Sequence, residues 1–238
     1  MTDKTSALAA TGLGKRYRHR WALHDVDLAV PTGRMTALIG PNGAGKTTLL
    51  HLTVGLLRAD RGELRVMGRR PGPDSIADIG FVAQEKPLYR DFAVQDMLRL
   101  GRHLNPGWDD GYARRRLATY DIALRRTIGG LSGGQRAQVA LTMAMAKRPH
   151  MLVLDEPAAN LDPVARRDFL TAVAAEAATT GVTVVHSSHD IAGLDQHCDH
   201  VVLLSDGRVR LAGDIPEVLA PGRALEEFIV DTLREVAP

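Results

Sequence analysis

Apolar runs and alternating apolar and polar residues mark the strands that this sequence predicts. Residues 35–39 and 151–154 form nearly continuous apolar runs, as in strands buried on both faces of a sheet. Residues 24–30 alternate between apolar and polar side chains, which indicates a strand with one buried face. The strands expected from such patterns span residues 6–13, 24–30, 35–39, 63–67, 79–83, 151–154, 182–185, 201–204 and 208–211.

Helical patterns separate most of these strands and indicate the fold class. Ser132 and Asp162 are good N-cap residues, and Pro163 suits the first position of a helix. Asp206 and Gly207 form a turn signal that predicts a hairpin between the last two strands. The expected helices span residues 47–57, 94–104, 112–124, 131–147, 163–178, 215–219 and 224–234. This order predicts an α/β fold with a mostly parallel sheet, and the alternating strands near the N-terminus predict an antiparallel β layer.

The chain changes character after residue 84. The next stretch is rich in arginine, has helical patterns and lacks a convincing strand. We therefore expect one domain, residues 1–238, whose α/β core and β layer are residues 1–84 and 150–238, with a helical sub-domain at about 85–149. The arginines at 114–116 and 125–126 are expected on solvated faces. The alternative is a contact with a membrane-embedded partner or with lipid headgroups.

Composition narrows the range of partners. The chain has 238 residues, with 30 basic and 28 acidic side chains and 4% aromatic residues. Neither the near-balanced charge nor the few aromatics indicate a nucleic-acid partner. The single cysteine, Cys198, fits a reducing compartment and is expected to be an ordinary structural residue rather than a reactive thiol. No apolar run approaches the ~20 residues that cross a bilayer, so any membrane span is expected on another chain.

The strongest motif follows the apolar run at 35–39. It has the form G-x-x-x-x-G-K-[ST] and leads into a helical pattern, the setting of a phosphate-binding P-loop. Its glycines allow backbone N–H groups to surround phosphate oxygens, and the helix N-terminus adds partial positive charge. Lys46 is expected to reach the β- and γ-phosphates of ATP, and Thr47 to hold Mg²⁺. The residues expected to bind the nucleotide here are Gly40, Pro41, Asn42, Gly43, Ala44, Gly45, Lys46, Thr47 and Thr48.

Two carboxylates form a second motif at the end of the apolar run 151–154. Asp155 and Glu156 are expected at the carboxyl end of a buried strand, the edge of such a sheet where ligands bind. Asp155 is placed to hold Mg²⁺. Glu156 is placed to polarise a water for in-line attack on the γ-phosphate. An acidic strand end is common by itself, and the preceding P-loop favours the catalytic interpretation.

A third motif separates families that share a P-loop. The sequence Leu-Ser-Gly-Gly-Gln at 131–135 resembles the signature of the ATP-binding-cassette (ABC) ATPases. A serine hydroxyl, glycine N–H groups and a helix N-terminus together suit an anion. The resemblance implies that two subunits pack head to tail with two-fold symmetry. Each ATP would then lie between the P-loop of one subunit and Ser132, Gly133, Gly134 and Gln135 of the other.

Two positions match family motifs that act around the γ-phosphate. Gln84 matches the Q-loop glutamine, which the resemblance implies senses Mg²⁺ and the attacking water. His189 resembles the switch histidine that contacts the γ-phosphate. The resemblance therefore implies a catalytic set of Glu156, His189, Gln84 and Lys46, with Thr47, Gln84 and Asp155 near the metal.

Two further positions match motifs at the edges of the nucleotide. Asp162 matches the D-loop, which crosses to the partner subunit, and it is also a plausible helix N-cap. Ala159 and Asn160 depart from the Ser-Ala that the family more often has there, so no role is implied for them. Tyr17 resembles the A-loop aromatic residue that stacks on adenine, and Trp21 is the alternative for this role.

The resemblance implies the ATPase subunit of an ABC transporter, with ATP and Mg²⁺ as cofactors. Its expected partners are a second copy or a homologous ATPase subunit and transmembrane permease subunits on separate chains. It would be cytoplasmic and peripheral on the inner face of the cell membrane, without insertion. The P-loop residues 42–48 and the ending at 225–228 resemble drug-resistance exporters, so export is the expected direction.

Two alternatives belong to other classes of ABC protein. A soluble ABC ATPase of iron–sulfur cluster assembly has a similar length and would have only soluble partners. DNA-repair and ribosome-associated ABC proteins require a long coiled-coil insertion or two tandem cassettes, and this chain has neither.

Overall fold

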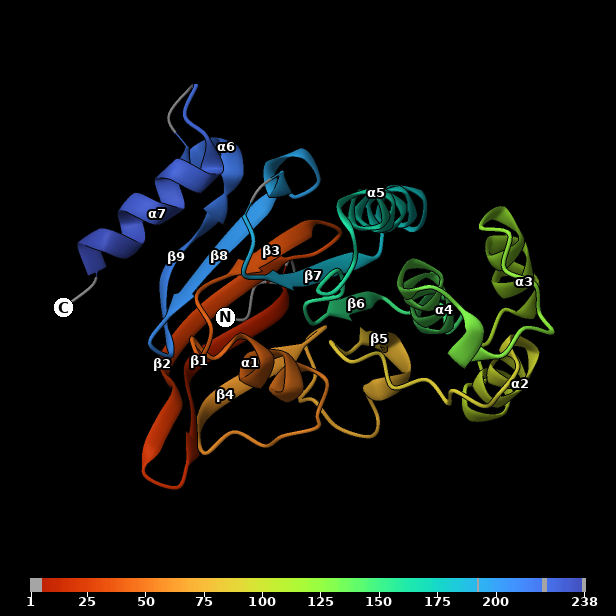
Figure 1. Cartoon of the computed structure of the whole chain (residues 1–238). Coiled ribbons are helices and arrows are strands. Elements are labelled where there is room, and N and C mark those ends of the chain that lie inside the picture. The colour runs from red at the N-terminus through yellow and green to blue at the C-terminus, as the bar shows by residue number, and fades with distance from the viewer. Residues whose placement is uncertain (1–5, 192, 220–221, 237–238) are drawn as a thin grey trace.

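A computed structural model describes residues 6–191, 193–219 and 222–236 and contains two sheets flanked by helices (Figure 1). The larger sheet has the order β5-β6-β7-β3-β8-β9, and the smaller has the order β2-β1-β4. The strands are β1 (Ser6–Tyr17), β2 (Arg20–Pro31), β3 (Met35–Ile39), β4 (Arg61–Val66), β5 (Ile79–Val82), β6 (Met151–Leu154), β7 (Thr183–Ser188), β8 (His200–Ser205) and β9 (Arg208–Asp214). The helices are α1 (Lys46–Thr53), α2 (Val94–Leu104), α3 (Asp110–Thr119), α4 (Gly133–Met145), α5 (Pro163–Thr180), α6 (Ile215–Val218) and α7 (Leu225–Val236).

The larger sheet is parallel except for its last strand. β3 pairs in parallel with β7 and β8, and only β9 runs antiparallel, as the partner of β8 in the predicted hairpin. Alternate residues of β3 pack on opposite faces: Met35, Ala37 and Ile39 lie with residues of α4, α5 and α7. Leu38 lies with residues of α1 and the smaller sheet. Burial on both faces explains why β3 and β6 have apolar runs rather than alternation.

The smaller sheet is antiparallel and extends further than the sequence pattern predicts. The basic segment at 15–21 lies between the strands predicted at 6–13 and 24–30. It is the end of a long hairpin between β1 and β2 in which only Arg18 and His19 form the turn. Arg16 pairs with Trp21 across the hairpin, and its guanidinium lies 5.6 Å from the indole ring. Stacking of the guanidinium on the indole stabilises strand pairing in a segment whose charge favours a solvated loop.

The helices between β5 and β6 have a hydrophobic cluster of their own. Val94, Leu98, Leu117 and Val139 belong to it, and α2 and α3 lie at the opposite end of the molecule from α7 (Figure 1). Two helices end four or more residues earlier than predicted. α1 ends at Thr53 because Gly55, with φ of 76°, turns the chain, and α3 ends at Thr119 ahead of Asp121, with φ of 51°.

Two side chains outside the strand pattern are buried. Arg116, expected on a solvated face, is only 7% exposed because α4 and α5 cover it, so that expectation is wrong. Cys198 is 6% exposed, and burial together with Asp199 and Asp195 raises the pKa of its thiol to about 12. A buried, protonated thiol is a poor nucleophile, which agrees with the structural interpretation.

Candidate nucleotide-binding site

The P-loop lies between the end of β3 and the start of α1 and packs directly on the backbones of two other strands. A Cβ at Gly40 would approach the carbonyl oxygen of Leu204 to 2.1 Å, and one at Gly45 would approach that of Ala22 to 2.4 Å. Gly45 also has φ of 106°, a conformation that side chains disfavour. These two glycines therefore fix the loop against β8 and β2.

Lys46 is buried inside the curve of the loop. Its Nζ donates hydrogen bonds to the carbonyl oxygens of Gly40 at 2.6 Å and Pro41 at 3.3 Å. The same nitrogen lies 3.6 Å from Oε1 of Glu156. The ammonium group thus lies where the loop and the carboxylate of Glu156 meet, a position suited to the charge of a phosphate.

Asp155 is 2% exposed and is held by two hydroxyl groups. Thr47 Oγ1 donates to Asp155 Oδ1 at 3.2 Å, and Ser187 Oγ donates to the same oxygen at 2.8 Å. The Ser187 hydroxyl also accepts a hydrogen bond from the backbone N–H of Glu156 at 2.8 Å. Ser187 therefore orients both carboxylate positions. Ser187 is not among the site residues predicted from the sequence, although its place at the end of a buried strand parallel to β6 is a usable signal.

Glu156 and His189 are in direct contact, through Oε2 of the carboxylate and Nδ1 of the imidazole. Glu156 has φ of 44°, an uncommon conformation for a residue with a side chain and one that tends to occur at functional sites. Together with Gln84 and residues 42–48 they line a cavity of about 300 Å³. The structure thus brings together residues from four separate stretches of the sequence: Lys46, Thr47, Gln84, Asp155, Glu156 and His189.

A neighbouring cavity of about 320 Å³ shares Gln84, Glu156 and His189 with the first. His186 lines it, is 2% exposed, and its Nδ1 has no hydrogen-bond partner among the described residues. Burial, with Arg166 and His197 nearby, lowers the pKa of His186 to about 4, so the imidazole is neutral at pH 7. His186 directly follows the strand predicted at 182–185, and the sequence pattern gives no sign that it lines a cavity.

The expected aromatic residues do not line the P-loop cavity. Tyr17 is 48% exposed near the tip of the hairpin, and Ala22 of β2 lines the cavity instead. Trp21 packs against Gly14 and lies 5.0 Å from the Arg61 guanidinium, so it is held by its own sheet. Of the two aromatic side chains, Tyr17 is therefore the more accessible for stacking against another ring.

The signature residues also lie outside the P-loop cavity of their own chain. Ser132 and Gln135 form a capping box at the start of α4, in which Ser132 Oγ accepts from the N–H of Gln135 at 3.1 Å. Asp162 caps α5 by accepting from Val164 N–H at 3.0 Å and from Ala165 N–H at 2.9 Å. Both motifs thus have a local structural role and stand at exposed helix N-termini.

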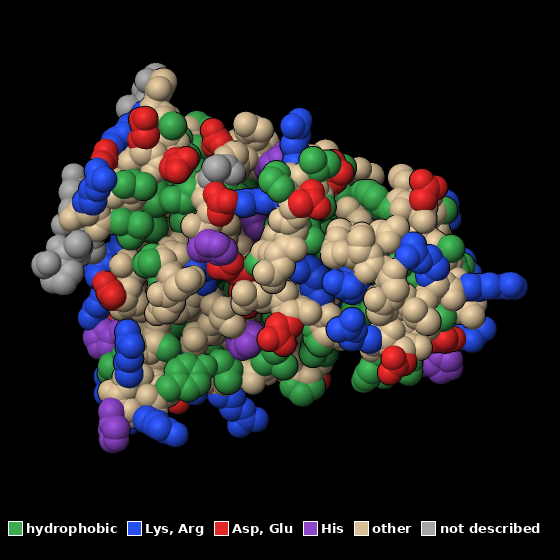
Figure 2. Space-filling view, in the orientation of Figure 1, with side chains coloured by type: hydrophobic (Ala, Val, Ile, Leu, Met, Phe, Trp, Pro, Cys, Tyr) green, Lys and Arg blue, Asp and Glu red, His purple; other side chains and the backbone are tan. Residues whose placement is uncertain are grey.

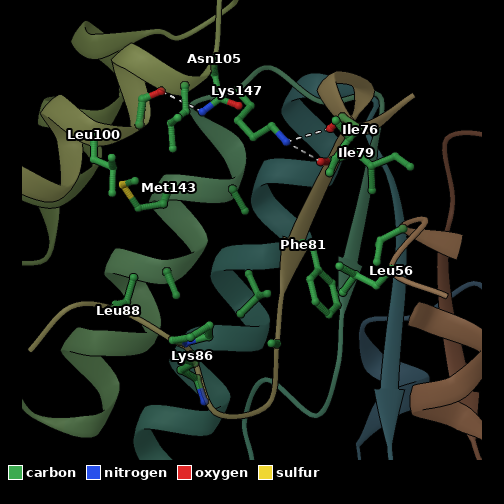
Figure 3. Close-up of a pocket in the computed structure, with 18 residues that line it drawn as sticks. Leu56, Ile76, Ile79, Phe81, Lys86, Leu88, Leu100, Asn105, Met143 and Lys147 are labelled. Carbon is green, nitrogen blue, oxygen red and sulfur yellow. Dashed lines mark hydrogen bonds between the residues drawn. The ribbon is translucent and has the colours of Figure 1, made fainter. Parts of the chain in front are cut away.

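An apolar groove of about 350 Å³ lies between the larger sheet and α2 (Figure 3). Leu56, Ile76 and Leu104 at its edges are 60%, 50% and 69% exposed. Lys147 Nζ donates to the carbonyl oxygens of Ile76 at 2.9 Å and Ile79 at 2.8 Å, and burial lowers the pKa of this lysine. The lining of this groove is mostly apolar, whereas the face of the molecule shown in Figure 2 has intermixed basic and acidic side chains.

Comparison with known proteins places this geometry in a family. Residues 23–159 match the profile described as ABC transporter. The chain is 35% identical to Hemin import ATP-binding protein HmuV of Streptomyces coelicolor, over 92% of this chain and 82% of that protein. It is 33% identical to Sulfate/thiosulfate import ATP-binding protein CysA of Synechococcus elongatus, over 91% of this chain. It spans 65% of that relative's length.

Solved structures confirm the predicted fold class. An ATP binding subunit of an ABC transporter superposes with a TM-score of 0.83 at 27% identity, covering 96% of this chain and all of that one. CbiO1 of Clostridium perfringens, part of an ABC transporter complex, gives 0.79 at 26% identity, over 97% of each chain. Among the described residues, no helix combines the length and apolar character needed to cross a membrane.

Proposed function

Because this chain belongs to the ABC transporter family of ATP-binding subunits, we propose that it hydrolyses ATP to power transport through membrane subunits on other chains. The observation that carries this proposal is the single cavity at which Lys46, Glu156, Gln84 and His189 meet. Phosphoryl transfer to water requires a cation for the phosphates and a carboxylate that orients the attacking water, with further polar side chains beside them. Lys46, Glu156 and the pair Gln84 and His189 supply these groups.

Mg²⁺ fits the oxygen atoms that the site offers. The Thr47 hydroxyl and the Asp155 carboxylate lie 3.2 Å apart beside the P-loop, and Mg²⁺ prefers such oxygen ligands together with phosphate oxygens and water. Thr47 and Asp155 would hold the ion, with Gln84 close by. Bound Mg²⁺ would neutralise phosphate charge during the reaction.

Other residues of this chain are assigned to the phosphates, the attacking water and the adenine. Lys46 exchanges its hydrogen bonds to the loop carbonyls for phosphate oxygens, and Glu156 orients and polarises the attacking water. His189 contacts Glu156 and lines the same cavity, and we assign it to the γ-phosphate. Tyr17 is assigned to stacking on adenine, since its ring is exposed beside β2, whose Ala22 lines the cavity.

The second half of the site is assigned to another subunit. Ser132, Gly133, Gly134 and Gln135 lie outside the cavity of their own chain, so an anion site there serves a nucleotide bound elsewhere. We assign residues 131–135 and Asp162 to contact with the ATP of a second copy or a homologous subunit. Closure of two such subunits over two ATP molecules would be the step that drives transport.

The apolar groove beside α2 is assigned to the membrane subunit. It runs from Leu56 to Leu104 and adjoins Lys86, two residues after Gln84, so occupation of the groove can be coupled to the γ-phosphate. This assignment treats residues 85–149 as a sub-domain that moves against residues 1–84 and 150–238. It places the protein on the inner face of the membrane through its partner, without insertion.

The direction of transport is a separate question from ATP hydrolysis. The relatives named above are import proteins, so they give no support to the export direction that the P-loop and residues 225–228 favoured. They also do not favour the alternative in iron–sulfur cluster assembly. We propose a subunit that powers transport, whose direction and substrate are set by the membrane partner.

The P-loop assignment is tested with Lys46→Ala. This variant should lose ATPase activity by at least about a hundredfold, because the buried ammonium beside Glu156 is the cation nearest to the expected phosphates. Arg70→Ala, which removes a cation whose side chain is 81% exposed, is the control and should retain activity. Phosphate release at saturating ATP and Mg²⁺ measures both, and equal activity in both variants would refute the assignment.

A further inference from the structure

A buried polar cluster joins α3, α4 and α5 away from the nucleotide cavity. Glu176 on α5 accepts two hydrogen bonds at one oxygen, Oε1: from Tyr112 Oη at 2.7 Å and from Arg116 Nε at 3.0 Å. The side chains of Arg116 and Glu176 are 5% and 17% exposed. Burial and the carboxylate of Glu176 raise the pKa of Tyr112, so its hydroxyl remains a donor.

The other edge of the Arg116 guanidinium is bound to α4. Its Nη1 donates to the carbonyl oxygen of Gln138 at 3.2 Å and to Thr142 Oγ1 at 2.9 Å. Its Nη2 donates to Gln138 Oε1 at 2.9 Å. One planar group therefore fixes backbone and side chains of α4 relative to a carboxylate of α5, with directional bonds that an apolar contact lacks.

These two helices begin with the two motifs that our proposed function assigns to the partner subunit. α4 begins directly after Ser132, and α5 begins directly after Asp162. Their N-terminal ends also touch: a Cβ at Gly134 would lie 3.2 Å from Cβ of Ala165, and one at Gly133 would lie 3.5 Å from Leu161 Cδ2. The helices are thus held at their N-termini by packing and further along by Arg116 and Glu176.

We propose that Arg116 and Glu176 are positioning residues that set the spacing between the signature and the D-loop. The inference rests on the proposed function, in which both motifs must meet the partner subunit at once. α4 and α5 also contribute apolar side chains such as Leu141 and Phe169 to one buried cluster. Apolar packing is not directional, whereas the hydrogen bonds of Arg116 fix how far the helices can slide and tilt. Neither residue touches the nucleotide cavity, so the pair acts only through the helices that it joins.

The test separates positioning from folding by working in a chain that binds ATP without turning it over. In a Glu156→Gln background, the dissociation constant of the ATP-bound dimer is measured by analytical ultracentrifugation. ATP affinity of the monomer is measured at protein concentrations below that constant. Glu176→Ala should raise the dimer dissociation constant at least tenfold and leave monomer ATP affinity within twofold. Glu176→Gln, which keeps an acceptor oxygen for both donors, should recover most of the loss.

Two further variants keep the test decisive. Arg115→Ala removes the exposed neighbour of Arg116 on α3 and should change neither constant. The double variant Arg116→Met, Glu176→Leu removes the buried charges together, which is often neutral for folding, so its melting temperature should stay within a few degrees of the parent. Its dimer should nevertheless be weakened as strongly as that of Glu176→Ala.

The possible results are distinguishable. An unchanged dimer constant in Glu176→Ala, or a parallel loss of monomer ATP affinity, would overturn the positioning role and leave the proposed function intact. Normal dimerisation of the double variant would do the same. If the Glu156→Gln parent itself stays monomeric at saturating ATP, the assignment of residues 131–135 and Asp162 to a second copy fails, and the positioning role fails with it.

Discussion

Substitution of one P-loop glycine tests how the loop is anchored. Gly45→Ala places a Cβ 2.4 Å from the carbonyl oxygen of Ala22 and 2.8 Å from Leu23 Cδ2. The residue also keeps φ of 106° and ψ of 5°, which lies outside the region that alanine favours. The substitution should therefore force the loop away from β2.

The expected cost follows from these two effects. A left-handed backbone costs an L-residue about 1–2 kcal/mol. Forcing a Cβ against a backbone carbonyl that cannot rotate away adds about 1–3 kcal/mol, as for an overpacked core. Gly45→Ala should lower the free energy of unfolding by about 2–5 kcal/mol. It should also weaken ATP binding, because the loop N–H groups move with the backbone.

A neighbouring glycine is the matched control. Gly43 has φ of 81°, and a Cβ there would meet nothing within 4 Å. Gly43→Ala should therefore show only the backbone cost of about 1–2 kcal/mol. Urea unfolding of the nucleotide-free variants measures both, provided the m-values agree. Equal destabilisation of the two variants would refute the claim that close packing on Ala22 fixes this loop.

Two other predictions concern His186 and Ser132. Because burial lowers the pKa of His186 from 6.5 to about 4, the unfolded chain binds the His186 proton more tightly than the folded chain does. The neutral imidazole therefore costs no stability above pH 6.5, and the folded state loses stability as the pH falls from 6.5 towards 4. The loss is about 3 kcal/mol at 1.36 kcal/mol per pH unit. Urea unfolding should therefore show that the free energy of unfolding of His186→Leu rises by about that much relative to wild type between pH 7 and pH 4. Parallel curves of unfolding free energy against pH for the two proteins would contradict this prediction. Ser132→Arg should leave ATP binding to the monomer unchanged and abolish ATPase activity, because the signature serves the partner's nucleotide; wild-type turnover in this variant would remove that role.

Much of the fold was predictable because local and tertiary preferences agree along most of the chain. β3, β6 and α2 occur at the predicted bounds, since runs such as Met151–Leu154 and the spacing in Val94–Leu104 suit one kind of element only. The hairpin end at residues 15–21 was not predictable from charge. Its strand pairing depends on a stacked Arg16 and Trp21, a contact between strands that no local pattern encodes.

The site was predictable where spacing along the chain carries the chemistry. The P-loop and the pair Asp155–Glu156 follow from short motifs after apolar runs. The role of Ser187 as a shared hydrogen-bond partner depends on β6 and β7 being neighbours in the sheet, which is a property of topology. Arg116 was misassigned because a run of arginines indicates a solvated face, and only the packing of α3 against α4 and α5 shows which one is buried.

We propose that this chain holds half of an ATP site and that a second copy supplies the other half. It is tested most directly by the mass of Glu156→Gln in solution, measured by light scattering with and without ATP and Mg²⁺. We expect a monomer without nucleotide and a dimer with ATP, and we expect a monomer again when Ser132→Arg is added. A Glu156→Gln protein that binds ATP and remains a monomer at saturating nucleotide would contradict it.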